Sequence, residues 1–445
     1  KNLKDFALGG QRLGPWVIAF SERASGESAW LLLGLPGAAM VMGLLELWTA
    51  IGCIGGIILS WMIIAKPLRI ATEKYNAITL PELLSKKFND DSGIIRLLAA
   101  VIIIFFFTFY VAAQFSGAGK VLNVTFGLTQ MQGMILGACI IIFYTILGGF
   151  LAVAWTDLIQ GIIMIGTLVI LPIVGWMELS GLEHSTGTLD WSTLYGGASG
   201  LKAFLGAVAG LSWGLGYMGQ PHLLVRYMAI DDPKNIRISR RIAIAWAIPA
   251  FIGSLFIGLV GAQLISGGMI SPVSDPETLM PEMAKTLMHP WIAGIFISGA
   301  IAAMMSTADS QLLVSTSVLT EDIIGKYFHH KIGKINLLTI GRMFTIVIGI
   351  IAFYLAWQTK DLVFEMVSYA WSGLGASFGP VIVCALWWKR TTRNGIIAGM
   401  LTGAISTIIW KNIEVLNTMV TERLISFVFA FMAVIIVSLY TKSKK

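Results

Sequence analysis

The sequence contains little charge for its length. Only 12% of its 445 residues are Asp, Glu, Lys or Arg, while 56% are hydrophobic. An average soluble domain is about 25% charged, and no soluble fold can bury this much apolar surface. Apolar runs that reach the ~20 helical residues needed to cross a bilayer recur along the whole chain. The composition therefore excludes a water-soluble protein and predicts a polytopic membrane protein surrounded by the lipid bilayer.

Long alternating patterns are also lacking. A transmembrane β-strand alternates polar and apolar residues over roughly 10 positions, whereas residues 102–107 and 427–437 are apolar on every face. A β-barrel is therefore excluded, and the fold class is predicted to be all-α.

Cysteine is scarce as well. Cys53, Cys139 and Cys384 lie in three separate apolar runs. They offer neither the spacing of a metal site nor a disulfide framework. We interpret all three as packing residues.

Hydropathy predicts twelve spans that alternate across the membrane. The formal net charge of +7 could indicate a nucleic-acid partner, but in a membrane protein it is more simply explained by basic residues retained on the cytoplasmic side, so no nucleic acid is expected. The predicted spans are residues 14–36, 41–66, 95–123, 130–148, 150–177, 201–229, 238–266, 288–322, 336–357, 362–388, 394–411 and 421–441.

The positions of the basic residues predict the orientation. They crowd the loops after the second and sixth spans, the latter counted from Arg226 to Arg241. The opposite loops, near 178–200 and 267–290, hold a single lysine, Lys285, and no arginine. We therefore predict a multi-pass protein of the plasma membrane, in a bacterium the inner membrane, with both ends of the chain cytoplasmic. The abrupt start at Lys1 suggests that a leading helix is absent from this chain.

Two predicted spans are interrupted in their middles. The first contains the polar residues 21–28, Ser-Glu-Arg-Ala-Ser-Gly-Glu-Ser, and the sixth contains residues 213–221, Trp-Gly-Leu-Gly-Tyr-Met-Gly-Gln-Pro. Secondary transporters built from inverted five-helix repeats carry such broken helices in matching positions, and bind solute and ion there. Tolerated kinks in packed helices are the alternative. We favour breaks because polarity and glycine coincide at both places.

Span eight carries hydroxyl groups suited to a hard cation. Sodium takes oxygen ligands, which a membrane site can draw from carbonyls freed at a helix break and from hydroxyls of a neighbouring helix. Ser306, Thr307 and Ser310 are candidates, with the Ala303 carbonyl behind them. Spacing alone fits a structural role equally well, because serine and threonine in membrane helices usually bond their own backbone or a partner helix.

Charged residues inside predicted spans are costly and call for a partner, a pore or an ion. Arg23 and Glu27 are four residues apart and can pair on one helix face. Asp157 lies near the predicted cytoplasmic start of span five, where an acid suits an ion exit path or an ordinary interfacial position. Glu22 and Asp309 complete the set.

Aromatic residues make up 11% of the chain, and most are expected to pack between helices. Trp213 and Tyr217 differ because they lie in a predicted break, so we expect them to line a solute pocket. His222, directly after the break, is interpreted as structural.

Several motifs resemble the sodium/solute symporter family, and within it the sodium/proline branch. The resemblance runs nearly end to end, and its most specific part is the Gly-Tyr-x-Gly-Gln-Pro-His run at 216–222. The other matching stretches are Leu-Gly-Gly at 8–10, Leu-Gly-Pro-Trp at 13–16, Gly-Leu-Pro-Gly at 34–37, Gly-Gly-Phe-Leu-Ala-Val at 148–153, Trp-Thr-Asp at 155–157, Ser-Thr at 306–307, Gln-Leu-Leu at 311–313 and Thr-Arg-Asn-Gly at 392–395.

The resemblance implies a five-plus-five inverted-repeat core of the leucine-transporter type. Residues 14–177 would form the first repeat and residues 201–388 the second, inverted repeat. Residues 394–441 would add two C-terminal transmembrane helices.

The resemblance also implies a site. Sodium would be held by backbone oxygens of Ala24 and Glu27 together with Ala303, Ser306 and Thr307. The solute would contact Ser28, Tyr110, Trp213, Tyr217 and Pro221. Asp157 would lie on the sodium exit path.

This chain departs from the sodium/proline pattern at the first break. There the family carries an aspartate directly after the Ala-Ser pair, whereas this chain has Gly26, with the carboxylate one residue later at Glu27. One residue turns a helical side chain by about 100°. Glu22 and Arg23 also replace small residues. These differences bear on the solute and the coupling ion, and leave the fold unaffected.

The predicted function is sodium-coupled uptake of a small amino acid by alternating access, with L-proline as the leading candidate solute. No enzyme chemistry is expected. Proton coupling or another amino-acid or carboxylate solute on the same fold is the alternative. A membrane sensor domain is a remote one, and a passive channel is disfavoured because no filter motif or charge ring is present.

Overall fold

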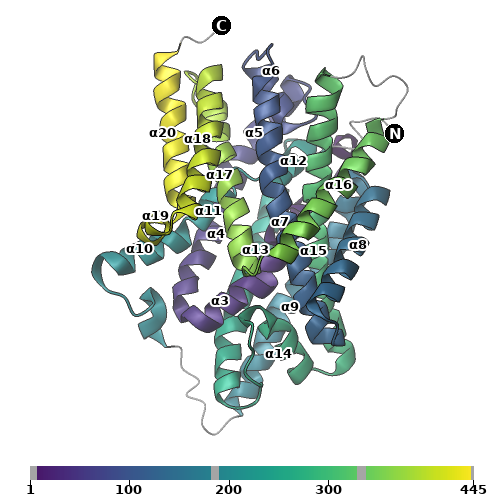
Figure 1. Cartoon of the computed structure of the whole chain (residues 1–445), viewed down its shortest axis with the longest axis vertical. Helices are drawn as coiled ribbons and strands as arrows, with labels where there is room; N and C mark the ends of the chain where they lie inside the picture. Colours follow the sequence, from purple (N-terminus) through teal and green to yellow (C-terminus); the bar gives the residue numbers. More distant parts are fainter. Residues whose placement is uncertain (1–7, 182–189, 328–336, 442–445) are drawn as a thin grey trace.

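The computed structural model describes residues 8–181, 190–327 and 337–441, which form a bundle of long helices (Figure 1). The described residues contain no strand beyond one isolated bridge between Leu13 and Ile230, which confirms the predicted all-α class. In the first half the helices are α2 (Pro15–Ala29), α3 (Leu35–Met42), α4 (Leu47–Leu59), α5 (Ala65–Lys74), α6 (Leu80–Lys87), α7 (Ile94–Phe126), α8 (Gln130–Leu147) and α9 (Phe150–Ser180).

The second half of the chain is also helical, and the helices near its start are short. Its helices are α10 (Gly200–Leu211), α11 (Trp213–Gly216), α12 (Pro221–Ala229), α13 (Ile236–Ser266), α14 (Leu279–Leu287), α15 (Pro290–Val318), α16 (Leu337–Gln358), α17 (Val363–Trp387), α18 (Arg393–Asn412), α19 (Glu414–Met419) and α20 (Glu422–Tyr440). Short 3-10 helices lie at Gly9–Gln11, Gly43–Glu46, Trp191–Tyr195 and Pro276–Thr278, and π-helical turns at Trp30–Gly34, Ser60–Ile64 and Leu319–Gly325.

Within the described residues, nine helices are long and apolar enough to cross a membrane by length and composition. One of them, the 60-residue stretch Pro15–Lys74, includes two predicted spans, which separate at Gly43 with its positive φ of 63°. The sixth predicted span is divided among α10, α11 and α12, and α18 is not among the nine. The chain is therefore a multi-pass membrane protein.

The two ends of the bundle differ in the segments they carry. In Figure 1, α6 and the C-terminus lie at the upper end, whereas α14 lies at the lower end. The N-terminus of α6 is capped by Thr79, whose Oγ1 accepts the Glu82 N–H at 3.1 Å. The basic residues around α6 and the lysine-poor segment around α14 therefore lie at opposite ends of the bundle.

Glycines let α4 approach α11 at backbone distance. A Cβ on Gly56 would lie 2.2 Å from the Gly214 carbonyl oxygen, and a Cβ on Gly214 would lie 2.1 Å from the Gly52 carbonyl oxygen. Membrane helices associate through such small residues because lipid tails leave packing as the main driving force. This contact fixes the position of α11, which enters the second helix break.

Candidate functional site

The first predicted break lies at the end of α2. Ser28 has φ 43° and ψ −168°, so the helical geometry is interrupted there. A non-glycine residue with positive φ persists only where its surroundings hold it. Here the freed Ala29 N–H donates to Gln114 Oε1 of α7 at 3.0 Å, and the Trp30 N–H donates to Ser28 Oγ at 3.3 Å. The break is confirmed, and α7 stabilises it.

The second predicted break lies between α11 and α12. α11 ends at Gly216, and α12 begins at Pro221, which has no N–H to donate to the preceding turn. The Gln220 side chain bridges the gap by donating to the Trp371 carbonyl at 3.0 Å. Gly219 packs against the α17 backbone, because a Cβ there would lie 2.7 Å from the Gly375 carbonyl oxygen. Glycine is therefore required where the chain leaves the helix.

Four of the five predicted sodium ligands, Ala24, Ala303, Ser306 and Thr307, lie together between α2 and α15. Ser306 Oγ donates to the Ala24 carbonyl at 2.9 Å and has the Ala303 carbonyl oxygen at 3.1 Å. Thr307 Oγ1 donates to the Ser25 carbonyl at 3.0 Å. The Glu27 carbonyl accepts the Trp30 N–H one turn further along. Hydroxyl and carbonyl oxygens of this kind are the donors a hard cation takes, so the residues fit sodium.

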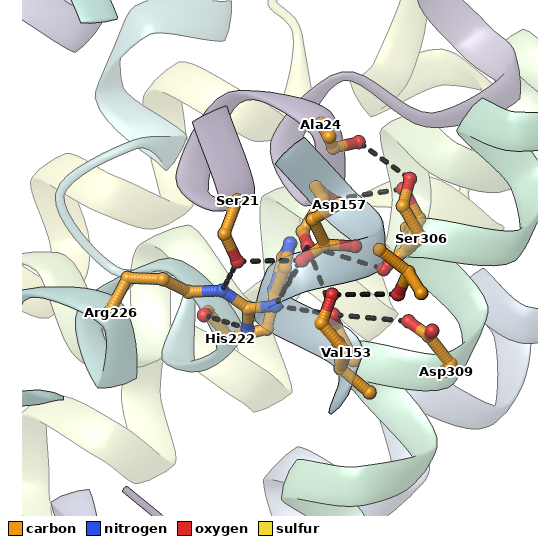
Figure 2. A network of polar contacts seen from close by, with 12 residues as sticks. Ser21, Ala24, Val153, Asp157, His222, Arg226, Ser306 and Asp309 are labelled. Atoms are coloured by element: carbon orange, nitrogen blue, oxygen red, sulfur yellow. Dashed lines mark hydrogen bonds and ion pairs between the residues drawn. The ribbon is translucent and has the colours of Figure 1, made fainter. Parts of the chain in front are cut away.

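A second polar network adjoins these oxygens and centres on Asp157 (Figure 2). Asp157 Oδ2 accepts hydrogen bonds from Ser21 Oγ at 2.6 Å, Ser25 Oγ at 3.1 Å and Arg226 Nη2 at 3.1 Å. Arg226 Nη2 also donates to Ser310 Oγ at 2.5 Å. These side chains come from α2, α9, α12 and α15 and are 0% exposed. The network therefore ties four helices together at the ion-ligand cluster.

The Asp157 network holds more negative than positive charge. Asp309 lies beside it, and its Oδ1 accepts from Ser310 Oγ at 3.2 Å. Asp157 Oδ1 and Asp309 Oδ2 are buried without a hydrogen-bond partner among the described residues. Two carboxylates thus face one guanidinium.

Arg226 is the residue that the sequence pattern placed wrongly. The sequence pattern groups it with the basic residues of the loop after the sixth span, but Arg226 is 0% exposed and pairs with Asp157 inside the bundle. The reason is geometric, because α12 runs inward from the break at Pro221. Its Nη1 also donates to the His222 carbonyl at 2.7 Å. The sequence contains one indication that Arg226 is buried, because it lies four residues after His222 and therefore on the same face of the helix.

A second buried charge cluster lies at the first break. Arg23 Nη1 pairs with Glu27 Oε1 at 2.6 Å, which confirms the predicted pairing across four residues. Arg23 also holds Glu22, with Nε donating to Oε2 at 2.6 Å and Nη2 to Oε1. The Tyr217 hydroxyl donates to Glu27 Oε2 at 2.9 Å. The cluster thereby joins the two broken helices.

Aromatic rings surround this cluster. Trp213 stacks on Trp30 with ring centroids 4.8 Å apart, and the Tyr110 hydroxyl lies 3.4 Å from Ser28 Oγ. Trp371 of α17 has its ring centroid 4.7 Å from that of Tyr217 and donates its indole N–H to the Trp213 carbonyl at 3.0 Å. The structure therefore brings together four predicted solute residues around Trp371.

Pro221, the fifth predicted solute residue, lines a small cavity between α6, α12 and α15, together with Pro81, Val225 and Leu313. Its chain neighbour Gln220 donates to the Trp371 carbonyl at 3.0 Å, so Pro221 lies one residue away from this contact.

The last helix also reaches the aromatic rings. Arg423, near the start of α20, lies with its guanidinium carbon 4.7 Å from the Trp213 ring centroid and donates to Ser368 of α17. The neighbouring Glu422 accepts from the hydroxyls of Ser368 and Ser372, each at 3.1 Å. A helix outside the predicted ten-helix core thus contributes charges beside the second break.

The family follows from a sequence comparison. The model of the sodium:solute symporter family matches residues 6–403. The chain belongs to this family. This symporter is accordingly a secondary active transporter that carries a solute together with sodium, and not an enzyme.

Curated relatives cover almost the whole symporter. The high-affinity proline transporter PutP of Bacillus subtilis (strain 168) is 40% identical over 99% of this chain and 93% of its own length. The sodium/proline symporter of Escherichia coli (strain K12) is 38% identical over 100% of this chain and 89% of its own length. The osmoregulated proline transporter OpuE of Bacillus subtilis is 37% identical over 99% and 90%.

Solved structures support the fold of the symporter. A sodium-coupled sialic acid symporter in a substrate-bound, outward-open state matches with a TM-score of 0.78 at 19% identity, covering 99% of this chain and 92% of that one. MHP1, a nucleobase-cation-symport-1 family transporter, matches with a TM-score of 0.61 at 13% identity, covering 98% and 93%. The predicted leucine-transporter-type fold is thereby confirmed.

Proposed function

We propose that this symporter uses the sodium gradient to take up a small amino acid, with L-proline as the leading candidate solute. The observation that carries the proposal is the convergence of Ala24, Ala303, Ser306 and Thr307 oxygens between a broken helix and α15. The names of the relatives support proline as the solute. The aromatic rings around Trp371 offer an apolar wall beside the break, where a small ring compound can pack.

The proposed cycle is alternating access. Sodium enters from outside, joins the broken α2 to α15 and so completes the solute pocket at Ser28, Tyr110, Trp213 and Tyr217, with Pro221 shaping α12. The positive end of the helical segment that follows Ser28 favours the solute carboxylate, because helix N-termini carry positive partial charge. Sodium then leaves past Asp157 to the cytoplasm. A membrane potential of 100 mV supplies about 2.3 kcal/mol for each charge carried.

The placement in the cell belongs to the same proposal. The two five-helix repeats span residues 14–177 and 201–388, with 394–441 as accessory helices. The basic loops and both ends face the cytoplasm of a bacterium, and the protein lies in its inner membrane.

Counterflow in proteoliposomes tests the function. Vesicles loaded with unlabelled proline should accumulate external labelled proline only when sodium is present. Accumulation of another amino acid, with no proline uptake under a sodium gradient, would contradict the proline assignment.

Ser306→Ala tests the ion site. Loss of one hydroxyl ligand is expected to raise the sodium concentration for half-maximal uptake by about 10- to 100-fold. The control is Ser315→Ala on the same helix, because Ser315 is buried but its hydroxyl has no hydrogen-bond partner among the described residues. An equal sodium dependence in the two variants would remove Ser306 from the ion site.

Proton coupling is the second candidate, and the buried carboxylates of Glu22, Glu27, Asp157 and Asp309 favour it. Replacing sodium by choline at constant pH separates the two. Undiminished uptake in choline would establish proton coupling, whereas loss of uptake supports sodium.

A further inference from the structure

The cluster at the first break contains one carboxylate more than it has cations. Glu22, Arg23 and Glu27 are 0% exposed. The charged side chains that act on Glu27 are Arg23 and Glu22. A buried charge without a counter-charge is expensive, so a second cation is expected to share the site at some stage of the cycle.

Hydrogen bonding shows that Arg23 gives two of its nitrogens to Glu22 and one to Glu27. Arg23 donates hydrogen bonds to Glu22 from two nitrogens, which is the bidentate geometry that makes arginine–carboxylate pairs strong. Glu22 also accepts the Trp61 indole N–H at 3.1 Å and the Tyr227 hydroxyl at 3.2 Å. Its two oxygens therefore have four donors, which is about the full capacity of a carboxylate.

Glu27 has acceptor capacity left. In the described part of the chain its carboxylate receives only two donors, Arg23 at 2.6 Å and the Tyr217 hydroxyl at 2.9 Å. An ionised carboxylate offers about four acceptor positions, so each oxygen retains one. Glu27 is thus the carboxylate that can accept a further cationic donor.

The position of Glu27 indicates the kind of cation. The next residue, Ser28, is the break itself and contacts the Tyr110 hydroxyl. Tyr217, which holds the other side of Glu27, belongs to the second break and packs against Trp371. The unused acceptor positions therefore lie among the residues proposed to hold the solute.

The ion site has a separate source of negative charge. The proposed sodium ligand Ala24 lies nearly one turn before Glu27, and the Asp157, Arg226 and Asp309 network beside it also has one carboxylate in surplus. Each of the two buried clusters thus has one carboxylate more than it has basic groups. The transported species together carry two positively charged groups, one for each cluster. Sodium is one of them, and the amino group of a zwitterion is the other.

We infer that the Glu27 carboxylate is the counter-charge for the cationic amino group of the solute. The solute class is then amino and imino acids with a free ammonium group, and carboxylates without one are rejected. Glu22 is a positioning residue, since it binds two nitrogens of Arg23 and so leaves Glu27 with one Arg23 nitrogen and one open acceptor position on each oxygen. This inference rests on the proposed function of amino-acid uptake.

A comparison of two ligands isolates this interaction. Proline and cyclopentanecarboxylate share the ring and the carboxylate, and differ in the amino group. In proteoliposomes the measured quantity is the inhibition constant of cyclopentanecarboxylate for proline uptake divided by the KM of proline. Glu27→Gln keeps the shape and removes the charge, so this ratio is expected to fall by about 10-fold or more. The sodium concentration for half-maximal uptake should change less than about 2-fold.

Glu27→Asp provides a second variant in case Glu27→Gln does not fold. Aspartate retains the negative charge, but its side chain is shorter by one methylene, so the carboxylate lies further from the solute. The ratio is therefore expected to fall less than in Glu27→Gln. Elution as a single symmetrical peak in detergent checks folding for both variants.

The outcomes separate the inference from the proposed function. A wild-type protein without sodium-driven proline uptake overturns the function and this inference with it. Wild-type uptake with an unchanged ligand ratio in the folded variants overturns the inference alone. So does a ratio that stays constant while the sodium dependence shifts, because Glu27 would then serve the ion.

Discussion

Arg226→Gln is expected to abolish sodium-driven uptake and to lower the free energy of unfolding by roughly 3–5 kcal/mol. The substitution leaves Asp157 and Asp309 buried with no cation beside them, because Arg226 is the guanidinium in their network. It also removes the donor to Ser310 that links α12 to α15. Uptake in proteoliposomes and the melting temperature in detergent measure the two effects.

Two controls keep this expectation specific. Arg237→Gln changes a basic residue of the same sequence cluster that is exposed at the start of α13, and its effect should stay within about 0.5 kcal/mol. The double substitution Arg226→Gln with Asp157→Asn removes both charges of the pair, so the melting temperature should recover most of the way while uptake stays low. A melting temperature for Arg226→Gln equal to that of the wild type would show that Asp157 does not depend on this partner.

Gly56→Ala is expected to disrupt the contact between α4 and α11 beside the second break. The added Cβ would meet the Gly214 carbonyl oxygen at 2.2 Å and the Gly214 Cα at 2.5 Å, and both are backbone atoms that cannot rotate away. Overpacking of this kind costs about 1–3 kcal/mol. It also displaces α11, and with it the Trp213 ring. Melting temperature and the KM for proline should both change.

The neighbouring glycine supplies the matched control. A Cβ on Gly55 would have no atom within 4 Å, and alanine favours a helix over glycine by about 1 kcal/mol. Gly55→Ala should therefore leave uptake intact and stabilise slightly. Equal behaviour of the two variants would show that α4 and α11 can separate without cost.

The sequence predicted the features that depend on local chemistry. Three glycines and a proline cluster at 214–221 and together weaken a helix, and the polar residues 21–28 stand out against apolar neighbours, so both breaks could be located. The Arg23 and Glu27 pairing follows from helical spacing. The proposal that Ser306 and Thr307 bind sodium required the family resemblance, because hydroxyls at this spacing serve structural roles equally often.

Contacts between distant segments could not be predicted in the same way. Arg226 resembles a loop residue in the sequence because a hydropathy profile shows only how polar each stretch of the chain is. The profile does not show the direction in which α12 enters the bundle. Glu22 is satisfied by Trp61 and Tyr227, which lie 39 and 205 residues away in the chain. Trp371 gains its place among the solute residues only when α17 packs against α11. Such pairings depend on how whole helices cross.

The contact between α20 and Trp213 limits how this protein can be recombined. Arg423 and Glu422 are anchored by Ser368 and Ser372, so the last helix and α17 share one set of hydrogen bonds beside the second break. A chimera that took residues 393–441 from a relative would import a foreign neighbour for Trp213. The accessory helices are therefore not exchangeable modules, and an exchange that preserves the wild-type solute preference must transfer α17 together with them.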